Sequence, residues 1–127
     1  MTDKLIVSNN PLLKEKLEDY EKTFVNTVSE VYKTSRDLIH QNWILLTHPQ
    51  AGSIKPAQNP YRSIVLASSA ELDFYSLKTI ENAILNFEQF SQHHKKREYS
   101  PEIKKDYQLI DLSLLNSALK NKTTRKE

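Results

Sequence analysis

WILLTHPQAGSIKPAQNPYRSIVLAS, residues 43–68, is the stretch that decides the fold. Two continuously apolar runs, residues 43–47 and 63–68, are joined by a loop that contains the only glycine and three of the five prolines of the chain. A run without polar alternation is typical of a strand buried on both faces, as in a parallel sheet. We therefore expect residues 43–47 to form the innermost strand. An irregular loop of this length inside a compact domain is usually functional or disordered, so function is sought there.

The N-terminal part of the chain predicts a strand, a tight turn and a helix. Residues 5–7 are apolar, and Asn10 followed by Pro11 is typical of a helix start, because Asn caps free N–H groups and proline has no N–H to satisfy. The helical period then predicts one buried stripe, formed by Leu13, Leu17 and Tyr20. A second strand is expected at residues 23–26 and a second helix at residues 29–42.

The C-terminal half predicts two further helices. Asp73 is expected to cap a long helix that reaches His93, with an apolar stripe at Leu77, Ile80, Ile84 and Phe87. Ser100 and Pro101 are typical of a new helix start. Asp111 lies inside this last helical pattern and can equally mark a break followed by a short separate helix.

Together these elements predict an α/β fold with a small, mainly parallel sheet of about four strands flanked by helices, in Rossmann-like or flavodoxin-like layers. The chain of 127 residues fits one domain, which we place at residues 1–120, followed by a flexible basic tail at residues 121–127. Crossovers between parallel strands would have to be right-handed.

Composition excludes several classes of function. Lys and Arg total 18 against 16 for Asp and Glu, and this net charge of +2 is too balanced for a nucleic-acid-binding protein. The absence of cysteine excludes disulfides and thiolate chemistry, and the histidines lack the spacing of a metal site, so we expect no metal and no cofactor. The N-terminus is too polar for a signal peptide or a membrane span, so we expect a cytoplasmic protein without a membrane partner. The oligomeric state stays open.

Two polar turns are expected to meet at one edge of the sheet. In a 2-1-3-4 strand order the ends of the first and third strands are neighbours, and ligands of open α/β sheets bind at such a point. The candidate ligand-binding residues are Ser8, Asn9, His48, Ser53 and Lys55. A helix start and a lysine suit a small anion or carboxylate. Histidine also suits acid–base chemistry, so the alternative is a small enzyme that uses His48, although no nucleophile or carboxylate partner lies near it in sequence.

Four segments resemble the GrdX-like family, named for the glycine, sarcosine and betaine reductase operons of anaerobic bacteria. They are LIVSNNPLLKEKL, RDLIHQNWILLTHPQAGSIKPAQNPYRSIVL, LDFYSLKTIENAI and DYQLIDLSLL, at residues 5–17, 36–66, 72–84 and 106–115. The resemblance covers nearly the whole chain, and LLTHP…GSIKP…PY is its most specific part. It implies a non-catalytic accessory protein linked to the reductase system, with reductase-system proteins or a small anionic ligand as partners. The reductase components work through selenocysteine and cysteine, which this chain lacks, and the resemblance assigns no catalytic residues.

Overall fold

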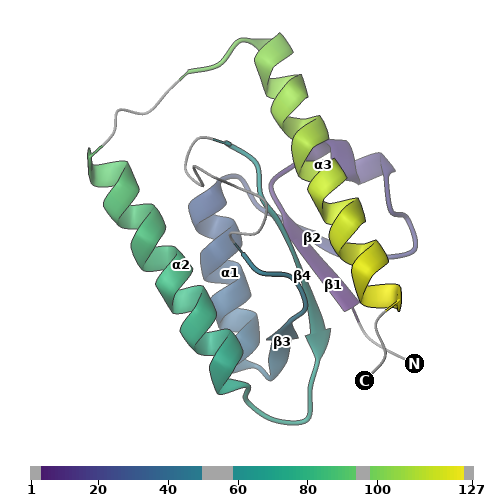
Figure 1. Cartoon of the computed structure of the whole chain (residues 1–127), viewed down its shortest axis with the longest axis vertical. Coiled ribbons are helices and arrows are strands. Elements are labelled where there is room, and N and C mark those ends of the chain that lie inside the picture. The colour runs from purple at the N-terminus through teal and green to yellow at the C-terminus, as the bar shows by residue number, and fades with distance from the viewer. Residues whose placement is uncertain (1–3, 50–58, 94–97, 125–127) are drawn as a thin grey trace.

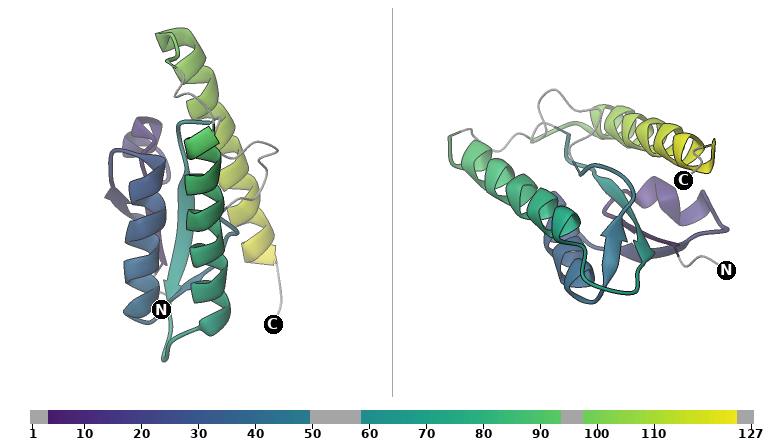
Figure 2. Two further views of the ribbon diagram at one scale, coloured as in Figure 1. Left: turned by 90° about the vertical axis from the view of Figure 1, so that its left-hand side faces the viewer. Right: turned by 60° about the horizontal axis from the view of Figure 1, so that its bottom comes forward.

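The computed structural model describes residues 4–49, 59–93 and 98–124 and shows a four-stranded sheet between two helical layers (Figures 1 and 2). The strands are β1 (Lys4–Ser8), β2 (Glu21–Phe24), β3 (Trp43–Leu45) and β4 (Ser63–Ser68). The helices are a short 3-10 helix, η1 (Pro11–Glu15), and three α-helices, α1 (Val28–His40), α2 (Phe74–His93) and α3 (Pro101–Thr124). Helices α1 and α2 lie on one face of the sheet, and α3 and η1 lie on the other.

The sheet is mixed, and this corrects the mainly parallel, Rossmann-like or flavodoxin-like sheet expected from the sequence. The strand order is β2-β1-β4-β3, in which only β1 and β2 are parallel. Strand β4 lies between β1 and β3 and is antiparallel to both. Parallel neighbours need a crossover, usually a helix, whereas the described residues between β3 and β4 contain no helix and the chain turns back beside its own strand.

The two inner strands are β1 and β4, and the strand expected to be innermost, at residues 43–47, lies at the sheet edge. Ile64, Val65 and Leu66 are fully buried, whereas the three residues of β3 are each half-buried at the sheet edge. Both segments are continuously apolar, so composition alone does not say which one lies inside. The edge at β3 is closed by a side chain, because the Leu45 N–H donates to Ser76 Oγ over 3.0 Å. Such a contact occupies a backbone group that would otherwise be open to another strand.

Two hydrophobic cores lie on opposite faces of the sheet. The larger core joins the sheet to α1 and α2 and contains the edge-to-face ring pair of Tyr32 and Phe87, with centroids 5.7 Å apart. The smaller core joins the sheet to η1 and α3, and its fully packed members are Ile6, Leu13, Val65, Leu115 and Leu119. Because residues alternate along β4, Val65 faces the smaller core while Ile64 and Leu66 face the larger one.

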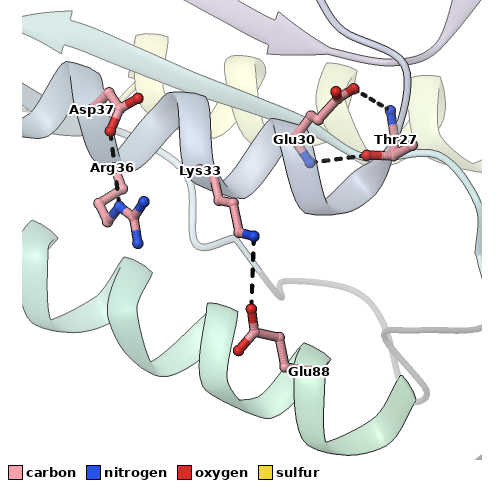
Figure 3. Close-up of polar contacts among 6 residues, drawn as sticks. All are labelled: Thr27, Glu30, Lys33, Arg36, Asp37 and Glu88. Carbon is pink, nitrogen blue, oxygen red and sulfur yellow. Dashed lines mark hydrogen bonds and ion pairs between the residues drawn. The ribbon is translucent and has the colours of Figure 1, made fainter. Parts of the chain in front are cut away.

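Local signals fix both ends of helix α1, and a surface ion pair joins it to α2. Figure 3 shows the contacts at its start and the ion pair. At its start, Thr27 Oγ1 accepts from the Glu30 N–H and the Glu30 carboxylate accepts from the Thr27 N–H, which is a capping box. At its end, Asn42 has a φ of 73°, a left-handed conformation that stops the helix. Lys33 Nζ lies 3.8 Å from Glu88 Oε2 of α2, an exposed contact that adds little stability.

The predicted first helix is only the short helix η1. Asn10 and Pro11 begin it as expected, with the Asn10 side chain accepting from the Leu12 N–H. The helix ends at Glu15, because Lys16 is extended with a φ of −123° and Leu17 then has a φ of 54°, so it does not continue through the predicted stripe. The predicted burial of this stripe is nevertheless confirmed, since Leu13 is buried and Leu17 and Tyr20 pack against the smaller core. The predicted strand at residues 23–26 lies slightly earlier, at Glu21–Phe24.

Helices α2 and α3 begin where the sequence predicted. Asp73 Oδ2 accepts from the Ser76 N–H over 2.9 Å, and Ser100 Oγ accepts from the Ile103 N–H over 3.3 Å. Helix α3 is continuous through Asp111, so the alternative break does not occur. It reaches residue 124, and residues 125–127 lie outside the described part of the chain, so the flexible tail stays a prediction. Among the described residues, no helix combines the length and apolar character needed to cross a bilayer.

Candidate functional site

Polar residues gather at one edge of the sheet. The pairing directions bring the carboxyl ends of β1, β2 and β3 to the same edge as the start of β4. Ser8, Asn9 and Asn10 follow one another at the end of β1, and Arg62 and Ser63 stand at the start of β4. All of these except Asn9 and Ser63 are buried, and α3 covers them with its central turns. We call Ser8, Asn10, Ser63 and Asp111 the polar cluster.

The hydroxyl groups of the polar cluster form a directed chain that ends at a carboxylate. Ser63 Oγ donates to Asp111 Oδ2 over 2.6 Å, and it lies 2.8 Å from Ser8 Oγ. Each hydroxyl has one proton to donate. Because the Ser63 hydroxyl donates its hydrogen bond to Asp111, the hydrogen bond between the two serines must be donated by the Ser8 hydroxyl. Ser8 Oγ in turn accepts from the Asn10 N–H over 2.9 Å. The chain therefore runs from Ser8 through Ser63 to Asp111.

Asn10 links three elements through one side chain. Its Oδ1 accepts from the Leu12 N–H and caps η1, while its Nδ2 donates to Gln108 O and to Asp111 Oδ2, each over 3.0 Å. The two acceptors leave only one orientation of the amide that satisfies every contact. Since Gln108 and Asp111 belong to α3, this side chain fixes where α3 lies along the sheet.

The acidic side chain of Asp111 is buried between α3 and the sheet. Burial raises the pKa of its carboxyl group above the ordinary value of 3.8, and the hydrogen bonds from Ser63 and Asn10 and the charge of Arg62 offset part of that effect. Burial also raises the pKa of the Tyr32 hydroxyl above its ordinary value of 10.0, and the positive charge of Arg62 offsets part of that effect. Arg62 thus contributes positive charge to both sides of the sheet near this edge.

Asn9 holds the end of the long loop against β1. Its Nδ2 donates to Pro60 O over 2.7 Å, and its Oδ1 accepts from the Arg62 N–H over 2.8 Å. The Tyr61 hydroxyl accepts from Gln108 Nε2 over 3.0 Å, which adds a contact from the same segment to α3. Residues 60–62 are therefore fixed to both the sheet and α3 by side-chain hydrogen bonds.

The structure brings some of the predicted ligand-binding residues together. Ser8 and Asn9 are neighbours at the polar edge, and their hydrogen bonds run to other parts of the chain. His48 lies beyond β3 and is exposed, next to the buried Pro49, whose carbonyl accepts from the Tyr32 hydroxyl over 3.3 Å. Ser53 and Lys55 lie outside the described residues. Because β4 separates β1 from β3, the predicted contact between those two strands is wrong, while anion binding by these residues stays a prediction.

Three of the four residues of the polar cluster, all except Ser8, were not predicted as ligand-binding residues from the sequence. Ser63 was predicted only as the start of a strand, Asn10 as a cap in the first polar turn, and Asp111 only as a possible helix break. The available signal was the placement of one acidic residue within the apolar segment LIDLSLL, residues 109–115. A carboxylate on the buried side of a helix needs donors from the surface that it covers. That requirement points to polar residues on the facing strands.

The geometry defines a small α/β protein in which a buried polar cluster joins a mixed sheet to its C-terminal helix. Within the described ranges, no three His, Asp or Glu side chains come close enough together to hold a metal ion. The chain belongs to the GrdX-like family, since the family model described as GrdX-like protein matches residues 5–120. Comparison with curated proteins and with solved structures finds no match.

Proposed function

We propose that this chain is a non-catalytic accessory protein of the glycine, sarcosine and betaine reductase system and that it binds a protein component of that system. Membership of the GrdX-like family supports the link to the system. Two features of the chain support binding rather than chemistry. The polar cluster is buried and serves to hold α3, and two adjacent aromatic side chains lie exposed elsewhere.

The observation that carries the proposal is the exposure of two adjacent aromatic residues in the first turn of α2. Phe74 and Tyr75 are 73% and 75% exposed, the highest values among the large apolar side chains of the described residues. Aromatic side chains are enriched among the residues that contribute most to protein–protein binding. Adjacent exposed aromatic rings form a contiguous apolar surface, and such surfaces mark interaction sites.

The first turn of α2 is held rigidly, which favours its use as a binding surface. Asp73 Oδ2 accepts from both the N–H and the hydroxyl of Ser76, over 2.9 and 2.6 Å. The same hydroxyl accepts from the Leu45 N–H of β3. The aromatic pair is therefore presented from a turn fixed to the sheet, and little conformational entropy is lost when a partner binds it.

Direct binding to purified reductase components tests the proposal. Each component is passed in turn over the immobilised chain, and we expect one of them to bind. The Phe74→Ala/Tyr75→Ala variant should weaken that binding at least about tenfold. Leu85→Ala is the matched control, because Leu85 is another exposed apolar residue of α2. Failure of every component to bind, or equal binding by the aromatic variant, would contradict the proposal.

A small anion or carboxylate is the second candidate ligand. Three features of the polar edge favour it: the buried charge of Arg62, the exposed imidazole of His48 and the turn at Asn9. A cationic side chain with reduced hydration attracts an anion more strongly than a fully hydrated one.

A further inference from the structure

Helix α3 carries a shallow hollow along one flank of its exposed surface. Figure 2 shows α3 as the outermost layer on its side of the molecule. Leu109 and Ile110 are 56% and 48% exposed on this helix. A shallow hollow runs beside them, and the described residues that line it belong to α3: Leu109, Leu112, Ser113, Asn116, Ser117 and Lys120. We call this surface the outer face of α3.

The hollow has the spacing of a receptor for one large side chain. Ser113, Asn116, Ser117 and Lys120 stand at positions i, i+3, i+4 and i+7, which is the four-residue hole that accepts a knob in coiled-coil packing. Three of these four residues are small or short, so the hole has room for a leucine. Leu109, one turn earlier on the same face, is an exposed leucine.

The charges along the outer face have opposite signs at its two ends. At 100° per residue, Glu102, Asp106 and Lys120 lie on the same side of α3 as Ser113. Lys104 and Lys105 point to other sides of the helix. The face therefore begins with acidic residues, has Leu109 and the small residues in its middle, and ends with a basic one. All of these side chains are exposed.

We infer that α3 pairs in antiparallel orientation with α3 of a second copy of this chain, about a twofold axis at Ser113. In that register Leu109 of each copy enters the hole formed by residues 113, 116, 117 and 120 of the other. Asp106 of each copy then lies opposite Lys120 of the other. The same patch is used twice, as a twofold-symmetric dimer requires.

Alternative registers do not satisfy the same features. A parallel pairing would place Asp106 against Asp106 and Lys120 against Lys120, and like charges across a contact repel. The small Ser113 at the crossing point lets the two helices approach closely. A contact made by one helix is smaller than the roughly 1,200 Å² of a typical stable complex, so the dimer is expected to be weak and concentration-dependent.

Sedimentation of the whole chain over a wide concentration range tests the dimer. We expect a reversible shift from monomer to dimer as the concentration rises. Leu109→Glu should raise the dissociation constant at least about tenfold, since it places a charge in the hole. Leu85→Glu on α2 is the matched control, because Leu85 is 52% exposed and Leu109 is 56% exposed. A chain that stays monomeric, or a dimer that both variants weaken equally, overturns the inference.

Two further variants test the antiparallel register. Asp106→Lys alone should weaken the dimer, and Asp106→Lys combined with Lys120→Asp should restore it, because the second change returns opposite charges to each pair. The chain contains no cysteine, so Ser113→Cys introduces a single thiol. At the twofold axis two such residues come within the roughly 4.4 to 6.8 Å between Cα atoms that a disulfide spans.

Oxidation of Ser113→Cys should therefore give a covalent dimer faster than oxidation of Ser91→Cys, an exposed position on α2. Equal rates for the two variants, or a double charge variant that stays as weak as Asp106→Lys, would show that the register is wrong. A monomer whose binding to a reductase component is lost in Leu109→Glu would show that another protein covers this face, and would also overturn the inference.

Discussion

The side-chain amide of Asn10 donates to the carboxylate of Asp111 over 3.0 Å, and the two residues are 101 positions apart in the sequence. This contact joins the turn after the first strand to the middle of the last helix. Both side chains are buried, so neither can exchange its partner for bulk water. Contacts of this kind specify how two distant elements dock, beyond the apolar packing around them.

Loss of the Asp111 carboxylate should destabilise the fold. Asp111→Ala leaves the Ser63 hydroxyl and the Asn10 amide with a missing acceptor in a buried place, which costs about 1 to 3 kcal/mol. Urea unfolding followed by circular dichroism measures the change. Asp19→Ala, at an exposed turn, is the control and should leave the free energy of unfolding nearly unchanged. Equal stability of the two variants would show that the polar cluster contributes nothing to docking α3.

The pH dependence of stability should change in Asp111→Asn. Burial raises the pKa of Asp111 in the folded protein above 3.8, so the folded state binds this proton more tightly than the unfolded chain. The stability that this proton contributes is present at acid pH and is lost as pH rises through the folded-state pKa. The Asp111→Asn variant cannot bind this proton, so it lacks this pH-dependent contribution to stability.

The wild-type free energy of unfolding, minus that of the variant, should therefore be most positive at the acid end and fall toward neutral pH. Urea unfolding at intervals from about pH 4 to about pH 8 measures this difference. A difference that grows with pH would mean that the donors around Asp111 and the charge of Arg62 outweigh its burial.

Asn9→Ala should release the end of the long loop without unfolding the sheet. The Arg62 N–H donates to Asn9 Oδ1, and the variant removes that acceptor. We expect faster hydrogen exchange at the Arg62 amide, while the amides in the centre of β4 keep their protection, because their partners are backbone carbonyls. Amide exchange followed by NMR measures both groups at once. Unchanged exchange at Arg62 would show that the backbone alone fixes this segment.

Sulfate or a glycine-like carboxylate should bind weakly at the polar edge of the sheet. Chemical-shift titration should locate the change at Ser8, Asn9 and His48 and in the loop that carries Ser53 and Lys55. His48→Ala and Lys55→Ala should each weaken binding by about 1 to 3 kcal/mol if their hydrogen bonds are charge-assisted. Lys14→Ala is a control at an exposed cation on η1. Shifts that map elsewhere, or that Lys14→Ala reduces equally, would contradict this site.

Local signals in the sequence were sufficient to find most elements. Asp73 and Ser100 mark helix starts because short side-chain acceptors satisfy free N–H groups, and the structure confirms both. The four strands were also counted correctly. The failed first helix shows the limit of this reasoning. Leu13 and Leu17 have helical spacing and are packed on one core, yet the helix ends at Glu15, before the left-handed Leu17.

Strand order and direction were not available from local patterns. The apolar runs at β3 and β4 have the same character, and only the pairing of β4 with β1 places one inside and the other at the edge. For the candidate site, the turn at Ser8 and Asn9 was found because it ends a strand. The role of Asp111 was not found, because a carboxylate in a helix is usually exposed. The buried groups that donate hydrogen bonds to Asp111 also lie far from it in the sequence.

The smaller core has a consequence for the order in which the chain folds during synthesis. Ile6 and Leu13 emerge from the ribosome early, but the residues that cover them, Leu115 and Leu119, emerge about a hundred positions later. One face of the nascent sheet must therefore stay exposed until α3 has been made, even though α1 and α2 can already cover the other. Contacts between such distant positions form slowly, which makes this interval the time at which the nascent chain is most prone to aggregate or to need a chaperone.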